Sequence, residues 1–177
     1  MIRLASLLPI FALAASAADW SPPAEVRHEY ALCVAYQARF DGPYLVVRAT
    51  VGQGWHTFAL DNQRRAEEKL AGQPALSVDR ATEIKPLSGA AVSGPWFQSA
   101  PKDFSRPELR MFTWGFDHEA TFAAKAARNG GGPVKLSIKG QACTATVCKN
   151  IDVTLTVPAA AKAASPQLDL KSLVEAR

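Results

Sequence analysis

The sequence predicts an antiparallel β-sandwich, and three observations support this fold class. Seven to nine short segments alternate apolar and polar residues with a period of two, which is typical of strands that are buried on one face. Tight turns rich in Gly, Pro and Asn separate these segments. The chain order shows none of the strand–helix–strand spacing that a parallel sheet requires.

The clearest element is a hairpin over residues 134–157, in which two alternating segments are joined between Cys143 and Cys148. Placing these cysteines opposite each other also brings the apolar residues of the two segments together on one face. The apolar pairs are Val134 with Val157, Leu136 with Leu155, and Ile138 with Val153. On the polar face, Lys139 meets Asp152. Directly opposed Cα atoms lie about 4.5–5.5 Å apart, which a disulfide accepts.

The alternation places both cysteines on the polar side of the hairpin. A six-residue ring stabilises a fold by only about 2 kcal/mol in the chain-entropy model. We therefore expect a short bridge near the surface, of the kind that is opened and closed in thiol exchange. An inert clip is the alternative. A bridge from Cys33 to either cysteine would close a larger ring, but the hairpin register favours Cys143–Cys148.

Residues 1–17 have the features of a secretory signal peptide. They contain one positive charge, Arg3, then an apolar run and a small-residue ending, which predicts cleavage near Ala17 or Ala18. The mature chain is therefore expected to be exported to an oxidising compartment, where disulfides persist. No later run reaches the roughly 18 apolar residues of a membrane helix, so we expect no membrane span in the mature chain.

Length and charge indicate one domain that does not bind nucleic acid. We assign residues 18–158 to the sandwich and residues 159–177 to a linker and tail. The formal net charge is +4, of which Arg3 in the leader contributes one, and the longest basic run is Arg64-Arg65. Nucleic-acid-binding surfaces are more strongly basic than this.

The strands follow one another along the chain. We predict them at residues 28–40, 44–51, 55–60, 75–78, 82–87, 109–116, 119–127 and in the two arms of the hairpin. In the first strand, Tyr30 and Tyr36 lie on the side of the large apolar residues. Cys33 falls on the other side among small residues, which predicts a semi-exposed, packed and unreactive thiol.

Two short helices are expected besides the strands. In residues 61–72, Asp61 or Asn62 can cap the start of a surface helix and Gly72 can end it. Residues 167–177 can form a short C-terminal amphipathic helix that either folds back on the sandwich or docks a partner. Apart from its two predicted strands, the Pro-rich region 73–107 is expected to be loop.

Three blocks of the sequence resemble the family of N-terminal periplasmic domains of the thiol:disulfide interchange protein DsbD. They are Gly54-Trp55-His56-Thr57-Phe58, the Pro-rich middle, and Gly140-Gln141-Ala142-Cys143 through Cys148 with the strand at residues 151–157. The resemblance spans most of the chain, from about Arg27 to Pro158. It implies an immunoglobulin-like sandwich located in the periplasm.

The same resemblance implies a function and a site. In that family the cysteine pair passes electrons from a membrane-linked thioredoxin-like domain to periplasmic clients, and an aromatic cap loop shields the pair. Cys143 and Cys148 match the redox pair. The cap aromatic is expected at Phe104, which follows Asp103, or otherwise at Trp96 and Phe97. Aromatic residues on loops either plug a core edge or cover a site.

Thiol exchange requires access and a lowered thiol pKa, which a nearby cation can supply. Lys149 adjoins Cys148 and is the candidate for this role, which favours Cys148 as the attacked sulfur. A solvated loop lysine is the alternative interpretation of Lys149.

Three other function classes make different predictions. A non-catalytic binding sandwich would have a structural disulfide with a reduction potential below about −300 mV. A metal site would combine the cysteine pair with His28, His56 or His118, but no paired ligand spacing is present, so we expect neither a metal nor a cofactor. A serine hydrolase would require a nucleophile motif that the sequence lacks.

Overall fold

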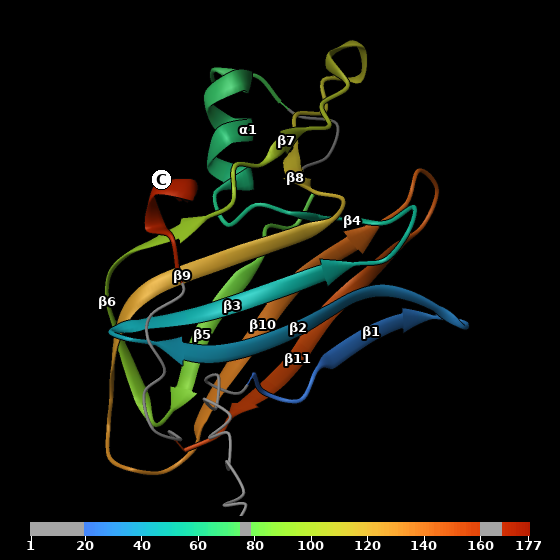
Figure 1. Ribbon diagram of the computed structural model, residues 1–177. Helices are drawn as coiled ribbons and strands as arrows, with labels where there is room; N and C mark the ends of the chain where they lie inside the picture. Colours follow the sequence, from blue (N-terminus) through green and yellow to red (C-terminus); the bar gives the residue numbers. More distant parts are fainter. Residues whose placement is uncertain (1–19, 75–78, 160–167) are drawn as a thin grey trace, which may run out of the picture.

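The computed structural model describes residues 20–74, 79–159 and 168–177. Two antiparallel sheets pack face to face in an all-β, immunoglobulin-like sandwich, as predicted (Figure 1). The predicted signal peptide and the predicted strand at residues 75–78 lie outside the described residues. None of the helices in the described part of the chain has the length and apolar composition that a membrane crossing requires.

The first sheet contains six strands within the described residues. Their spatial order is β1 (Ala24–His28), β2 (Ala31–Asp41), β3 (Tyr44–Val51), β9 (Glu119–Arg128), β6 (Ala90–Gln98) and β12 (Val174–Glu175). Strand β3 forms as predicted, and its alternating residues Leu45, Val47 and Ala49 are fully buried. This alternation gives the sheet one apolar face that must be covered.

The second sheet is organised on β10 (Val134–Cys143). One edge of β10 pairs with β11 (Cys148–Val157), and the other edge is shared between two shorter strands. Of these, β5 (Glu83–Ser88) pairs along residues 135–139 and β4 (His56–Phe58) pairs at Ala142 and Cys143. Beyond β4 the sheet continues through β8 (Trp114–Phe116) to β7 (Lys102–Asp103).

The core lies between the sheets and draws on both. Its largest fully buried side chains include Tyr36, Phe58, Phe122, Leu136 and Ile138. Phe116 of the second sheet contacts Phe122 of the first edge to face, with ring centroids 5.5 Å apart. Burying one such side chain stabilises the fold by about 1.5–3 kcal/mol, so this layer is what holds the two sheets together.

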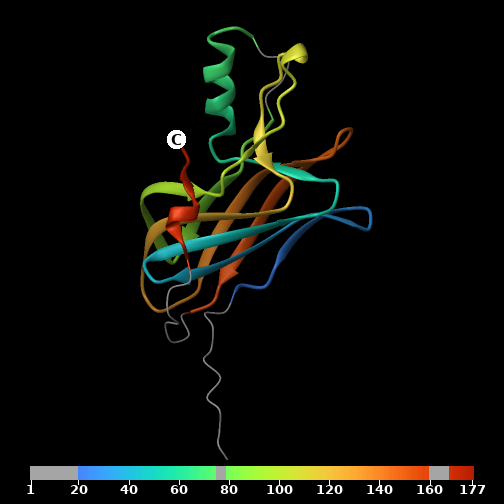
Figure 2. The same cartoon turned by 45° about the horizontal axis from the view of Figure 1, so that its top comes forward.

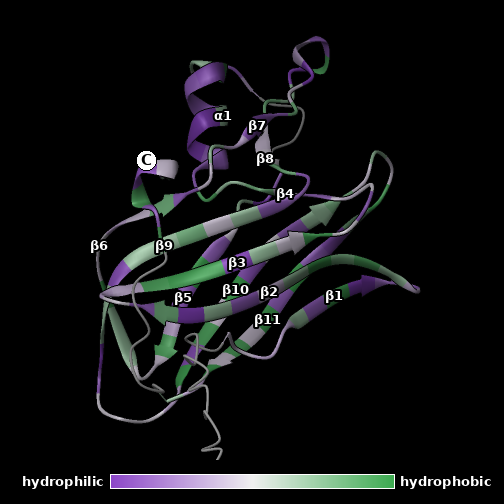
Figure 3. Cartoon of the chain, in the orientation of Figure 1, coloured by the Kyte–Doolittle hydropathy of each residue, from purple (hydrophilic) through white to green (hydrophobic). Residues whose placement is uncertain are grey.

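The predicted surface helix is present as α1 (Asn62–Leu70), which stands above the sandwich beside the arm formed by residues 102–116 (Figures 1 and 2). Its exposed face is hydrophilic (Figure 3). Asp61 occupies the N-cap position, but its side chain accepts a hydrogen bond from Gln98 Nε2 at 2.7 Å instead of capping the helix. At the other end Ala71, before Gly72, adopts the left-handed conformation that closes the helix.

The prediction of a short C-terminal helix is wrong. Within the described residues the tail contains one 3-10 turn, Leu170–Ser172, followed by β12, which pairs with β6. Ala176 N also donates to Trp96 O at 2.9 Å. The unpaired edge of β6 offers backbone partners, whereas an isolated helix of this length is marginal in water. The tail therefore folds back on the sandwich as a strand.

Residues 90–98 were expected to be loop and form a nine-residue strand instead. A register shift between Val92 and Trp96 accommodates Gly94 and Pro95, which had weakened the strand pattern. The predicted strand at residues 109–116 is in turn only partly correct. Within it only Trp114–Phe116 pairs as a strand, and a 3-10 turn occupies Pro107–Leu109.

Two expectations about the first predicted strand are also corrected. A separate strand, β1, precedes β2, and Tyr30 lies in the turn between them, where it is 97% exposed. Cys33 is fully buried rather than semi-exposed. The reason is tertiary, because β11 of the second sheet packs against β2, and Lys149 of β11 lies near enough for its charge to act on the Cys33 thiol.

Candidate functional site

The β10–β11 hairpin has the predicted register along its whole length, from Val134 opposite Val157 to Cys143 opposite Cys148. Lys139 and Asp152 form the expected pair, with Nζ and Oδ2 3.8 Å apart. In the connecting turn, Thr144 N donates to Val147 O at 2.8 Å. These short-range interactions hold the two cysteines opposite each other, at the two ends of the turn.

Cys143 and Cys148 form a disulfide, with an S–S distance of 2.07 Å and a Cα–Cα distance of 4.0 Å. The two residues differ sharply in exposure. Cys148 is exposed to solvent, whereas Cys143 is only 2% exposed. The hairpin pattern predicted the polar face for both cysteines, but it did not show that other segments cover Cys143.

One of the covering segments is β4, in which His56 pairs directly with Cys143. The His56 ring stacks on Phe104, with ring centroids 5.1 Å apart, and contacts Phe58 edge to face at 5.3 Å. Burial lowers the pKa of His56, and the negative charges of Asp79 and Asp117 act in the opposite direction. Phe104, our first candidate for the cap aromatic, thus contacts the histidine that pairs with the buried cysteine, and its role as a cap stays a prediction.

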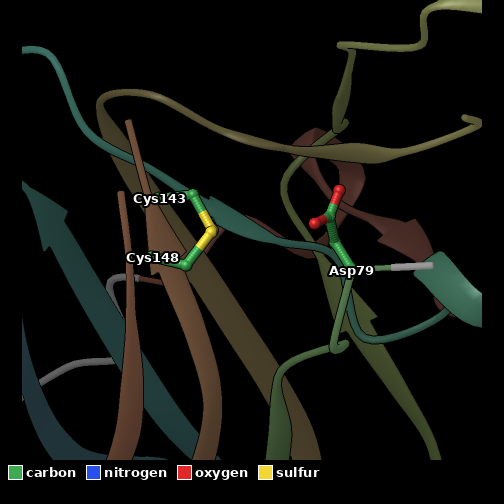
Figure 4. Close-up of side chains that lie close together, drawn as sticks. All are labelled: Asp79, Cys143 and Cys148. Atoms are coloured by element: carbon green, nitrogen blue, oxygen red, sulfur yellow. A yellow bond between two sulfur atoms is a disulfide. The ribbon is translucent and has the colours of Figure 1, made fainter. Parts of the chain in front are cut away.

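A second covering segment carries Asp79, which lies between α1 and β5. Its carboxylate and the two cysteine sulfurs lie within 4.8 Å of one another (Figure 4). Two hydrogen bonds hold the segment in place. Asn62 Nδ2 donates to Asp79 O at 2.9 Å, and Arg80 N donates to Gln141 Oε1 at 3.0 Å. Asp79 is therefore anchored both to α1 and to β10.

The close approach of this segment depends on Gly140. Its φ is +154°, and a Cβ at this position would lie 3.2 Å from Ala81 O and 3.3 Å from Thr82 Cα. Thr82 Oγ1 donates to Phe58 O at 2.6 Å, which ties the same segment to β4. The glycine thus leaves room for the chain to cross β10 between its two partner strands.

The other predicted site residues lie in different surroundings. Asp103 is exposed and accepts a hydrogen bond from Ser105 N at 2.8 Å, within the turn that carries Phe104. Lys149 pairs with Ala142 and alternates with Cys148, so its side chain leaves the opposite face of the hairpin. Its charge acts on Cys33, whose pKa burial raises and Lys149 partly lowers.

Trp96 and Phe97 are not loop residues. They lie in β6 of the first sheet, opposite Ala124 and Ala123 of β9. This placement contradicts the expectation that they belong to a cap loop, because the region around them forms a continuous strand.

Sequence reasoning missed His56 and Asp79 as neighbours of the disulfide. Both lie more than sixty residues before Cys143 in the chain, and neither has a local motif. Within the described residues, Asp79 and the two cysteines form a group of potential metal ligands that no histidine joins. The disulfide thus joins one exposed cysteine to one that is almost completely buried.

Comparisons with known proteins give structural matches only. No family model matches the chain, and no curated protein matches its sequence. Similar solved structures include the Neisseria meningitidis DsbD N-terminal domain in the reduced form, with 18% identity over 68% of this chain and 79% of that chain and a TM-score of 0.37. They also include the complex between the DsbD N-terminal and PilB N-terminal domains from Neisseria meningitidis, with 18% identity, coverage of 71% and 82%, and a TM-score of 0.39. Both structures contain the domain whose family the sequence resembles.

Proposed function

We propose that this chain is a periplasmic thiol–disulfide exchange protein that uses Cys143 and Cys148 as its redox pair. The observation that carries the proposal is the unequal exposure of the two bonded cysteine residues. A purely structural clip has no need of one shielded and one accessible sulfur, whereas an exchange site does. Exchange proceeds by attack of an external thiolate on a reachable sulfur, while the other sulfur leaves.

In the first half of the cycle, a thiolate of a reduced partner attacks Cys148 Sγ. A bond forms between the partner and Cys148, and the Cys143–Cys148 bond breaks with its electron pair passing to Cys143 Sγ. A second thiolate of the partner then attacks the partner's own sulfur in the mixed disulfide and releases Cys148. The partner leaves oxidised, and the hairpin holds two more electrons as a dithiol.

In the second half, the reduced pair transfers these electrons to a client disulfide. Cys148 attacks the client, forms a mixed disulfide and releases one client thiolate. Cys143 then attacks Cys148 Sγ, which reforms the internal bond, breaks the bond between Cys148 and the client, and releases the second client thiolate. His56 pairs with Cys143 in the sheet and stacks on Phe104, and we propose that these two rings limit access to Cys143. Such shielding favours docked protein partners over small thiols in solution.

We propose thioredoxin-like proteins as the partners, with a membrane-linked donor and periplasmic clients. This choice rests on the sequence resemblance to the DsbD N-terminal domain family, and the periplasmic location rests on that resemblance together with the predicted signal peptide. A DsbD N-terminal domain has been solved in complex with the PilB N-terminal domain. A partner of this chain would dock over the exposed sulfur of Cys148.

Trapping of mixed disulfides tests the proposal. Cys143→Ala removes the resolving sulfur and leaves Cys148 exposed, so this variant should accumulate covalent adducts with thioredoxin-like proteins in a periplasmic extract. Cys148→Ala is the matched variant, and it should give several-fold fewer adducts because Cys143 is shielded. Adducts are counted on non-reducing gels and identified by mass spectrometry. If neither variant forms adducts, the exchange function is wrong.

A redox titration separates exchange from the alternative, a binding module with a structural disulfide. An exchange site should equilibrate with glutathione or thioredoxin buffers at a potential above about −300 mV. A bridge that stays oxidised below that value would identify a structural clip.

A further inference from the structure

Beyond exchange, we propose that the reduced protein binds Zn²⁺ through Cys143 Sγ, Cys148 Sγ and the carboxylate of Asp79. Within the described residues, these three groups are the only set of potential metal ligands that the structure brings together, and they lie beside the turn of the hairpin. The site requires only that the disulfide can be reduced, so it does not depend on the identity of any redox partner.

The distances suit a metal once the bridge is open. All three ligand atoms lie within 4.8 Å of one another. Zinc binds thiolate sulfur at about 2.3 Å and carboxylate oxygen at about 2.0–2.2 Å, so two ligands of one tetrahedral ion lie about 3.5–3.8 Å apart. Figure 4 shows the three side chains with the bridge closed. Small side-chain rotations after cleavage of the S–S bond would bring all three ligand atoms to one ion.

Reduction and metal binding balance as two separate steps. A reductant supplies two electrons and water supplies two protons, which break the Cys143–Cys148 bond and leave two thiols. Zn²⁺ then displaces both thiol protons and binds the two thiolates together with the ionised carboxylate of Asp79. The oxidised protein has no thiolates to offer, so the metal and the disulfide exclude each other.

Strand pairing and hydrogen bonds hold the backbone that carries the three ligands. The two cysteines occupy directly paired positions at the ends of β10 and β11. Asp79 is held by the hydrogen bond from Asn62 to its carbonyl, and the next residue, Arg80, by its bond to Gln141. Ligands that are already positioned lose little conformational freedom on binding, which favours affinity.

The donor set selects the metal. Two thiolates and one carboxylate fit Zn²⁺, whereas Mg²⁺ and Ca²⁺ require oxygen ligands throughout. Cu(I) prefers sulfur and is satisfied by the thiolate pair without Asp79. Three protein ligands leave one zinc position open, and the exposure of Cys148 provides an entry path. Sequence reasoning had sought a histidine as the third ligand, and the structure supplies a carboxylate instead.

Metal titration of the reduced protein tests the proposal. A Cys33→Ala background leaves only the hairpin cysteines, and the bridge is reduced with a phosphine that is then removed without air. Competition with a chromophoric chelator should show one Zn²⁺ per chain for the reduced form and none for the oxidised form. Asp79→Asn should weaken Zn²⁺ binding at least about tenfold, since even outer-shell partners are worth about 10- to 100-fold. Asp79→Asn should leave Cu(I) binding unchanged.

Asp152→Asn is the matched control, because Asp152 is an exposed carboxylate on the same face of the hairpin, paired with Lys139. It should bind Zn²⁺ as the background protein does. Equal affinity of the Asp79→Asn and Asp152→Asn variants would overturn the site, as would equal binding by the oxidised protein.

A second readout uses the unaltered chain and so does not depend on how a variant folds. Zn²⁺ should slow alkylation of the reduced hairpin thiols by iodoacetamide, and Mg²⁺ at the same concentration should not. If Zn²⁺ gives no protection, the proposal fails. Because no redox partner enters either assay, their failure would leave the exchange function standing.

Discussion

The two edges of β10 are built differently. On one edge, β11 pairs with β10 without interruption, and a four-residue turn and a disulfide join the two strands. On the other edge, β4 and β5 each cover only part of the strand, and the Asp79–Thr82 segment crosses between them. The local edge carries the bonded sulfurs, and the non-local edge supplies Asp79, His56 and, through His56, Phe104. The disulfide and the side chains that surround it thus come from separate parts of the chain.

The largest loss of stability is expected where both edges depend on one residue. Ile138 is fully buried and pairs with Val153 on one side and Ile84 on the other. Ile138→Ala should lower the free energy of unfolding by about 2–5 kcal/mol, because it leaves a cavity in the core. Urea denaturation measures the effect. The control is Ser137→Ala on the neighbouring, half-buried position, which should stay within about 0.5 kcal/mol.

A smaller loss in the free energy of unfolding should distinguish the two edges of β10. Thr82→Val removes the hydroxyl that donates to the buried Phe58 carbonyl and should cost about 1–3 kcal/mol. Thr154→Val, on the exposed face of β11, makes the same change on the local edge and should stay within about 0.5 kcal/mol. The two variants are compared by urea denaturation under identical conditions. Similar losses in both would contradict the distinction between the edges.

The smallest change in stability is expected at the outer part of the non-local edge. There Asp117, in the turn before β9, forms an ion pair with Lys102 of β7. Hydrogen bonds from Lys102 and His118 hold the pKa of Asp117 at about 2. A lowered pKa in the folded state means that the pair stabilises the fold above the unfolded pKa of 3.8, and that this contribution is lost as the pH falls toward 2.

Asp117→Asn should therefore reduce the loss of stability between pH 4 and about pH 2, which is measured by denaturation at a series of pH values. Because Lys102 is largely exposed, the effect should stay below about 1 kcal/mol. Lys102→Met removes the other partner and should change the pH profile in the same direction. An unaltered profile in both variants would exclude the ion pair as a source of acid sensitivity.

The division between local and non-local pairing also explains what the sequence could predict. Alternation within residues 134–157 specifies both the faces and the register of the hairpin, so the Cys143–Cys148 bridge followed from the sequence. The same local signals located β3, β9 and α1. A two-layer sandwich was predictable because every one of these strands has one apolar side.

What could not be predicted depends on contacts between distant segments. Nothing near Asp79 or His56 in the chain indicates that either one reaches the disulfide. The burial of Cys33 depends on β11, and the tail becomes a strand because β6 has an open edge. Gly94 and Pro95 are unfavourable in a strand and so weakened the prediction of β6, yet a register shift in its pairing with β9 accommodates them. In each case a tertiary partner outweighed the local pattern.

Because Cys33 is buried, labelling of its thiol by a dye can be used to detect unfolding. Cys33 is free, has no solvent exposure in the fold, and has a pKa that burial raises. A thiol-specific dye added to the native, oxidised protein should therefore find nothing to label. After reduction the dye should label only the two hairpin cysteines. Labelling of Cys33 as a third site would show that the sandwich has unfolded.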